Sequence, residues 1–241
     1  MALSFKKEYE AHVRHEGPAN QGGKLRDFIL GGQDGLVNVL GILLAVAKAT
    51  NDAKLVIIAG LAATFAESIS MGAVAYTSTK AEKDYYQKEL QREKMEIDKF
   101  PEIEREEIRQ IYRKKGLRGK ELEAMVKTIT SNRQVWLDTM MSEELGLSSD
   151  TGDPLKSAVV VGISAVIGSL IPLAPFFFFS VGDAINVSLA FSALVLFAAG
   201  AVKAKLTVGN WFNSGAEMTL IGMASAIAGY LIGSLLGTPA G

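Results

Sequence analysis

Apolar residues are concentrated in five long stretches of this 241-residue chain. A transmembrane helix needs about 20 mostly apolar residues, because the hydrocarbon core of a bilayer is roughly 30 Å thick and each helical residue rises about 1.5 Å. The stretches that meet this requirement are Phe28–Ala47, Leu55–Thr79, Ser157–Phe179, Ala184–Val202 and Met218–Leu236. The last three contain no charged residue, which argues against buried core helices of a soluble protein. The pattern predicts an all-α polytopic membrane protein with five transmembrane helices.

The segment between the second and third apolar stretches has the opposite character. From Lys80 to Asp150 it contains 15 Lys or Arg and 16 Asp or Glu residues. The second span has no helix breaker at its end, so it is predicted to continue out of the membrane as a helix to Asp98. Proline in a first turn and glycine after a last turn mark the ends of further helices. These helices are predicted over Pro101–Lys115, Lys120–Thr130 and Asn132–Leu145.

These patterns divide the chain into four parts: an N-terminal segment (1–27), spans one and two (28–79), a charged helical insert (80–153) and spans three to five (154–241). Lys and Arg residues near spans favour the cytosolic side. They are frequent in the N-terminal segment and the insert, and two more lie in the loop 203–214. We therefore expect these three regions in the cytosol and the C-terminus on the opposite side.

Composition and motifs exclude several classes of function. The net charge of −1 argues against a nucleic-acid partner, which requires a basic face. The absence of cysteine excludes disulfides, thiolate metal sites and iron–sulfur clusters. There is no glycine-rich phosphate loop and no arrangement of nucleophile and base. We therefore expect neither an enzyme nor an organic cofactor, and transport driven by an ion gradient becomes the leading hypothesis, with membrane lipid as the surroundings.

Two spans contain an ionisable residue, and such residues cost a few kcal/mol to insert, which marks them as functional candidates. Asp34 and Asn38 are four residues apart and share a helix face, as do Glu67 and Met71. Together they offer two carboxylates, an amide oxygen and a thioether, a set that suits a divalent transition metal. The alternative is that Asp34 lies near the cytosolic surface and only caps a helix or extends its carboxylate to the aqueous interface.

The insert contains carboxylates at helical spacing that are candidate metal ligands. Residues three apart point the same way, and the candidates are the pairs Glu93 with Glu96 and Glu104 with Glu107, together with Glu144 near Met140 and Met141. In so charged a segment, solvated glutamates paired with lysines are the alternative, and the two methionines would then be packing residues. His12 and His15 are three apart in the polar N-terminal segment, a spacing that also suits a metal ion, but they are interpreted as surface residues.

Several motifs, in order along residues 24 to 236, resemble those of the vacuolar iron transporter family. The segment Arg26–Val37 resembles its first-span motif R-D-x-x-L-G-x-x-D-G-L, and Ile69–Gly72 resembles its second-span I-S-M-G. The remaining matches are the glutamate offsets around Pro101, the W-L-D-x-M-M-x-x-E-L-G-L pattern over Trp136–Leu147, and the third-span I-P-L-x-P at Ile171–Pro175.

The resemblance implies a five-span homodimer that exports cytosolic Fe²⁺, and often Mn²⁺, in exchange for protons. By motif position, Asp34 and Met71 would line the pathway. The cytosolic metal-binding domain would be formed by Glu93, Glu96, Glu104, Glu107, Met140, Met141 and Glu144. The membrane would be the cytoplasmic membrane in a prokaryote or the vacuolar membrane in a eukaryote.

The chain departs from the family pattern at one position. Plant members have a glutamate two turns before the second-span methionine, where this chain has Ala63; here the carboxylate lies one turn before it, at Glu67. Glu217 occupies a glutamate position shared with the family at the start of span five.

Two alternative functions remain open from the sequence. One is a membrane-anchored metal sensor or buffer, in which the spans only hold the insert at the membrane. The other is an exporter of Ca²⁺ or Zn²⁺, although methionine ligands disfavour Ca²⁺ and the scarcity of His and Cys disfavours Zn²⁺.

Overall fold

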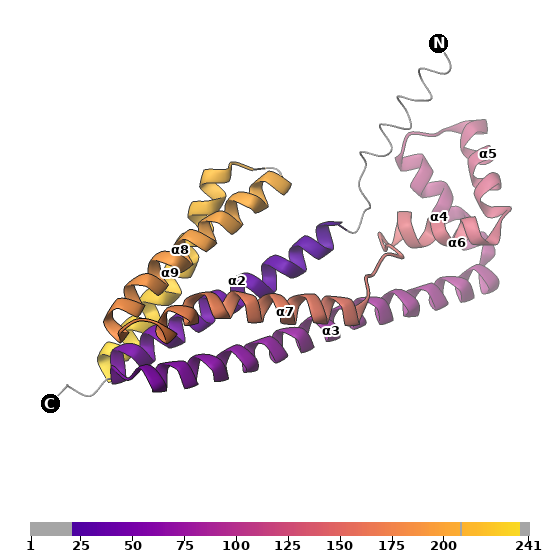
Figure 1. Ribbon diagram of the computed structural model, residues 1–241. Coiled ribbons are helices and arrows are strands. Elements are labelled where there is room, and N and C mark those ends of the chain that lie inside the picture. Colours follow the sequence, from indigo (N-terminus) through magenta and orange to yellow (C-terminus); the bar gives the residue numbers. More distant parts are fainter. Residues whose placement is uncertain (1–20, 208, 237–241) are drawn as a thin grey trace, which may run out of the picture. The chain divides into compact units, whose positions relative to one another are not determined.

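The computed structural model describes residues 21–207 and 209–236, and in this part of the chain all regular structure is helical (Figure 1). The N-terminal residues 1–20, with His12 and His15, lie outside the described residues. The α-helices are α2 (Gln21–Thr50), α3 (Ala53–Lys99), α4 (Pro101–Lys114), α5 (Gly119–Thr130), α6 (Arg133–Thr139), α7 (Pro154–Leu173), α8 (Val181–Leu206) and α9 (Trp211–Leu236). Two short elements extend them: a π-helix, η1 (Met140–Glu144), and a 3₁₀-helix, η2 (Ala174–Phe177).

Five of these helices are long and apolar enough to cross a membrane: α2, α3, α7 continued by η2, α8 and α9. The prediction of an all-α polytopic protein with five spans is therefore confirmed. As expected, the helix of the second span has no break at the end of the apolar stretch, since α3 is continuous over its 47 residues, from Ala53 to Lys99. Asp52 begins it by accepting hydrogen bonds from the backbone N–H groups of Lys54 (2.8 Å) and Leu55 (3.2 Å).

The chain forms two compact units. The membrane unit comprises the residues up to Tyr76 and those from Pro154 onward, and the insert unit comprises Thr77–Asp153. The insert unit thus begins three residues before the sequence pattern placed it, because the helix α3 passes from one unit into the other without a break.

Small residues allow the helices of the membrane unit to pack backbone to backbone, and Figure 1 shows α7 beside α2 and α9 beside α8. A Cβ atom at Gly168 of α7 would lie 2.1 Å from the carbonyl oxygen of Gly32 on α2. A Cβ atom at Gly229 of α9 would lie 2.0 Å from the carbonyl oxygen of Gly41. Such contacts are typical of helices that associate in lipid.

The third span changes its helical form at its prolines, before the end of the apolar stretch. Pro172 lies inside α7, which continues to Leu173, and the chain then tightens into η2 before Phe178. The α-helix therefore ends six residues before Phe179, where we placed the end of the span, because Pro175 supplies no backbone N–H to continue it.

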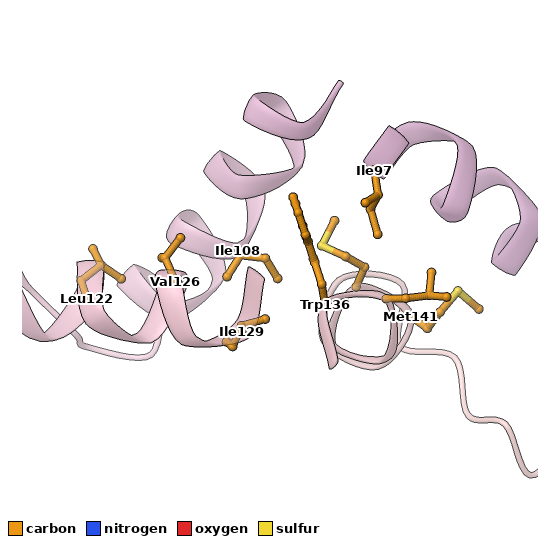
Figure 2. Packing of buried hydrophobic residues seen from close by; sticks show 9 residues of the cluster. Ile97, Ile108, Leu122, Val126, Ile129, Trp136 and Met141 are labelled. Atoms are coloured by element: carbon orange, nitrogen blue, oxygen red, sulfur yellow. The ribbon is translucent and has the colours of Figure 1, made fainter. Parts of the chain in front are cut away.

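The insert unit has its own hydrophobic core, built from α3, α4, α5, α6 and η1. In Figure 2 the ring of Trp136 stands between Ile108 on one side and Ile97 and Met141 on the other, and Leu122, Val126 and Ile129 of α5 lie on the same side as Ile108. The predicted start of α4 at Pro101 is confirmed. The last predicted helix is only partly α-helical, since it changes to the π-helix η1 at Met140.

Candidate functional site

Three carboxylates from three different elements of the insert unit converge on one point. Glu93 of α3, Glu104 of α4 and Glu144 of η1 each place an oxygen within 4.8 Å of the other two. Glu93 is 1% exposed and Glu104 is 4% exposed, whereas Glu144 is open to solvent. The cluster is therefore enclosed by protein on the side of Glu93 and Glu104 and accessible to solvent on the side of Glu144.

The local sequence explains why Glu93 and Glu104 point inward. Each precedes a buried isoleucine by four residues, Ile97 on α3 and Ile108 on α4. Because side chains four apart share a helix face, packing of the isoleucines in the core also turns the glutamates inward. Pro101 fixes the start of α4, so that Glu104 falls in its first turn, where a negative charge is favourable.

Glu144 reaches the cluster from the π-helical turn η1. There the backbone N–H of Leu145 donates to the carbonyl oxygen of Met140, five residues earlier, at 3.2 Å. This wider turn shifts the side-chain directions relative to an α-helix, and such insertions are frequent at functional sites. Gly146 then ends the helix with a φ of 64°, a conformation that glycine adopts without strain.

The two buried glutamates each have one oxygen without a hydrogen-bond partner, Glu93 Oε2 and Glu104 Oε2. A buried polar atom left without a partner costs about 1–3 kcal/mol, and more when it is charged. Proteins tolerate such atoms mainly where an ion, a water or a ligand satisfies them. Glu93 and Glu104 therefore each have unused acceptor capacity.

Burial and mutual repulsion raise the pKa values of these carboxyl groups above that of an ordinary glutamate. Burial, together with the charges of Glu107 and Glu93, raises the pKa of Glu104 to about 8. Burial likewise raises the pKa of Glu144 to about 7, again with contributions from Glu107 and Glu93. Burial also raises the pKa of Glu93, partly offset by a hydrogen bond from Arg92. Near neutral pH the cluster therefore holds protons that a cation could displace.

The other two predicted glutamates, Glu96 and Glu107, lie at the edge of the cluster. Both are half-buried, and both are close enough to raise the pKa values of Glu104 and Glu144 by charge repulsion. The structure thus brings together all five glutamates that the sequence singled out in the insert.

The predicted methionines have a different environment. Met140 is fully buried and Met141 is 2% exposed, and both belong to the hydrophobic core with Trp136. Figure 2 shows Met141 beside Trp136. Packing, which was the alternative interpretation, is therefore a function that both side chains perform, on the same π-helical turn that carries Glu144.

Sequence reasoning missed two residues beside the cluster, Arg92 and Glu89. The Arg92 guanidinium contacts Glu89 at 2.8 Å, Glu93 at 3.2 Å and Glu96 at 3.5 Å. Glu89 is only 4% exposed. Its position four residues before Glu93 on α3 was the available signal, because residues four apart lie on one face of a helix.

In the membrane unit, the predicted polar residues of the first two spans also meet. The Asn38 side-chain amide donates a hydrogen bond to Glu67 Oε1 at 3.1 Å, and the Asp34 carboxyl group interacts directly with that of Glu67. All three residues are half-buried, and so is Met71, one turn further along α3. The Glu217 side chain is exposed on α9. The spans therefore contain a polar group of two carboxylates and one amide.

Five apolar spans, a polar group between the first two and an acidic insert define a multi-pass membrane protein with two candidate cation sites. The model of the VIT family matches residues 25–234. Vacuolar iron transporter 1 of rice (Oryza sativa subsp. japonica) is 35% identical over 225 residues, which cover 91% of this chain and 89% of the relative. Vacuolar iron transporter 2 of rice is 37% identical, covering 86% and 85%, and vacuolar iron transporter 1 of Tulipa gesneriana is 35% identical, covering 86% and 84%. The chain belongs to the vacuolar iron transporter (VIT) family.

Proposed function

We propose that the protein exports cytosolic Fe²⁺, and also Mn²⁺, across its membrane in exchange for protons, and that the cytosolic insert captures the metal first. The observation that carries the proposal is the convergence of Glu93, Glu104 and Glu144, with two buried oxygens that have no hydrogen-bond partner. Oxygen ligands of this kind suit Fe²⁺ and Mn²⁺. The names of the relatives, vacuolar iron transporters, support iron as the substrate.

The polar group in the spans supplies the transport step. Asp34 and Glu67 interact with each other, and Asn38 donates to Glu67. A carboxylate binds either a metal ion or a proton, because the metal favours the ionised form. On the side with the lower pH, protonation of this group ejects the metal, and this competition couples the two movements. Met71 contributes a sulfur that favours a transition metal over Ca²⁺.

The protein is proposed to act as a homodimer with the N-terminal segment and the insert in the cytosol. The face of α3 that carries Leu55, Ile58, Phe65 and Ile69 is exposed within the single chain. In a bilayer such a face lies against lipid or against a second copy. A single-protomer mass from light scattering in mild detergent, after subtraction of bound detergent, would refute the dimer.

A sensor or buffer anchored in the membrane is the competing function. It would use the same acidic cluster, but it has no need for two carboxylates within the spans. Purified protein in sealed liposomes separates the two: the proposal expects Fe²⁺ to cross the membrane under an imposed pH gradient, whereas a buffer binds Fe²⁺ without moving it.

A further inference from the structure

Arg92 places a positive charge beside the acidic cluster. It lies on α3 and reaches Glu89 three residues before it, Glu93 directly after it and Glu96 four residues after it. Its Nη2 donates to Glu93 Oε1, so that one oxygen of Glu93 is bound to arginine and the other, Oε2, has no partner. The guanidinium is therefore shared among several carboxylates rather than paired with one.

Two of these three carboxylates, Glu93 and Glu96, belong to the proposed metal ligands. An arginine and a divalent ion compete for the same oxygens, because each is stabilised by the same negative charge. Arg92 also lies near enough to Glu144 to act on its carboxyl group electrostatically. A metal ion bound by Glu93 and Glu96 would weaken the attraction between the guanidinium and these carboxylates, because it neutralises their charge.

Glu89 differs from the other two partners of Arg92. It makes the shortest of the three arginine contacts, at 2.8 Å, and its side chain is 6% exposed. Glu89 also contacts Lys88 Nζ, at the longer distance of 3.9 Å. Glu89 is not one of the three residues whose oxygens converge on a single point. It can therefore hold Arg92 after metal has taken the neighbouring carboxylates.

We propose that Arg92 is an internal counter-ion that competes with metal for Glu93 and Glu96, and that Glu89 retains the guanidinium when metal binds. This inference rests on the proposed function of the insert. Arg92 stabilises the metal-free cluster and at the same time weakens metal binding. A capture site that must pass its metal on to the spans benefits from this competition, because a lower affinity means faster release.

The test uses the full-length protein in detergent, titrated anaerobically with Fe²⁺ by calorimetry, with thermal unfolding measured before and after Fe²⁺ addition. Arg92→Gln removes the competing charge, so Fe²⁺ binding is expected to tighten about three- to tenfold, in line with coupling between neighbouring charges. The metal-free variant is expected to unfold at a lower temperature than the parent. Tighter binding combined with lower metal-free stability distinguishes a counter-ion from a residue that only supports the fold.

Arg109→Gln is the matched control. It removes the same charge from the same unit, but Arg109 pairs with Glu106 and, at 2.8 Å, with Glu123, neither of which belongs to the cluster. Its Fe²⁺ affinity is expected to stay within about twofold of the parent. An equal increase in both variants would mean that net charge alone is responsible, and the inference would be wrong.

Glu89→Gln tests the second part of the inference independently. Without the Glu89 charge, Arg92 depends more on Glu93 and Glu96, so Fe²⁺ binding is expected to weaken. The double variant Arg92→Gln/Glu89→Gln is expected to bind like Arg92→Gln alone. If Arg92→Gln does not fold, unchanged affinity in Glu89→Gln is sufficient to overturn the proposal.

Glu93→Gln/Glu104→Gln separates failure of this inference from failure of the proposed function. If the double variant loses the main Fe²⁺ binding but Arg92→Gln does not tighten it, the insert binds metal and only the role of Arg92 is wrong. If the double variant binds Fe²⁺ like the parent, the capture site itself is wrong.

Discussion

The acidic cluster of the insert and the polar group of the spans are built from similar side chains in opposite surroundings. The insert gathers five glutamates from three elements, with Arg92 beside them and Glu144 open to solvent. The polar group of the spans consists of Asp34, Asn38 and Glu67 on two helices, amid apolar residues. Many ligands with an exposed side suit capture of metal from solution. Few ligands inside a membrane suit passage, because each buried charge is costly there.

The largest expected effect is loss of Fe²⁺ transport through the spans without any change in Fe²⁺ binding by the insert. Asp34→Asn keeps the size and polarity of the side chain but removes its charge and its ability to take up a proton. We expect proton-driven Fe²⁺ flux in liposomes to fall to the background of protein-free vesicles, while Fe²⁺ binding by the insert is unchanged. Flux at the parental rate would shift the coupling role to Glu67.

Substitutions in the insert are expected to weaken Fe²⁺ binding while the pathway through the spans stays intact. Glu93→Gln with Glu104→Gln removes two converging carboxylates and should weaken Fe²⁺ binding at least about tenfold, since the loss of even an outer-shell partner has an effect of that size in other metal sites. Flux should fall at low Fe²⁺ concentration and recover at high concentration, because the pathway in the spans is intact. Glu102→Gln with Glu121→Gln, two exposed glutamates of the same unit, is the control and should change neither quantity.

The pH dependence of the insert follows from its raised pKa values. The pKa of Glu104 is about 8 and that of Glu144 about 7, against an ordinary value of 4.5. The folded, metal-free unit therefore binds more protons than the unfolded chain, and its stability falls as pH rises from about 4.5 through 8. Fe²⁺ binding should release protons and tighten over the same range.

Two measurements check this prediction. Calorimetric titrations at pH 7 in buffers of different ionisation enthalpy give the number of protons released. Thermal unfolding of the metal-free protein between pH 5.5 and 8.5 should show the insert losing stability, and added Fe²⁺ should remove that loss. Binding that is independent of pH would show that the carboxylates are already ionised.

The smallest expected effect concerns the sulfur in the spans. Met71→Leu conserves volume, so stability should change by less than about 1.5 kcal/mol, and Fe²⁺ flux should decrease only a fewfold. Met223→Leu in α9 is the matched control, since Met223 is also half-buried in a span. Equal flux in the two variants would remove Met71 from the pathway.

The features of the fold that depend on local signals were predictable from the sequence. Apolar length identified the five spans, and the missing breaker after Thr79 predicted the continuation of α3. Pro101 marked the start of α4. The π-helix at Met140 was not predicted, because its extra residue per turn depends on how Met140 and Met141 pack in the core.

The sequence predicted which glutamates belong to the candidate site, but not how deeply each of them is buried. Spacing of three residues grouped Glu93 with Glu96 and Glu104 with Glu107, yet only the first residue of each pair is buried. Burial depends on contacts between helices, and the buried isoleucine four residues later would have indicated it. Arg92 was overlooked because in a segment with 15 basic residues nothing local distinguishes the one that faces the cluster.

The central claim is exchange of metal for protons, and simultaneous recording of both ions tests it most directly. Liposomes containing the parental protein, an internal Fe²⁺ indicator and an internal pH indicator receive external Fe²⁺ with no pH gradient imposed. The account predicts that Fe²⁺ entry is accompanied by proton exit, so that the lumen becomes alkaline in step with the iron signal, and that Asp34→Asn abolishes both. Fe²⁺ entry without a pH change would contradict proton exchange, and Fe²⁺ binding without entry would establish the anchored buffer instead.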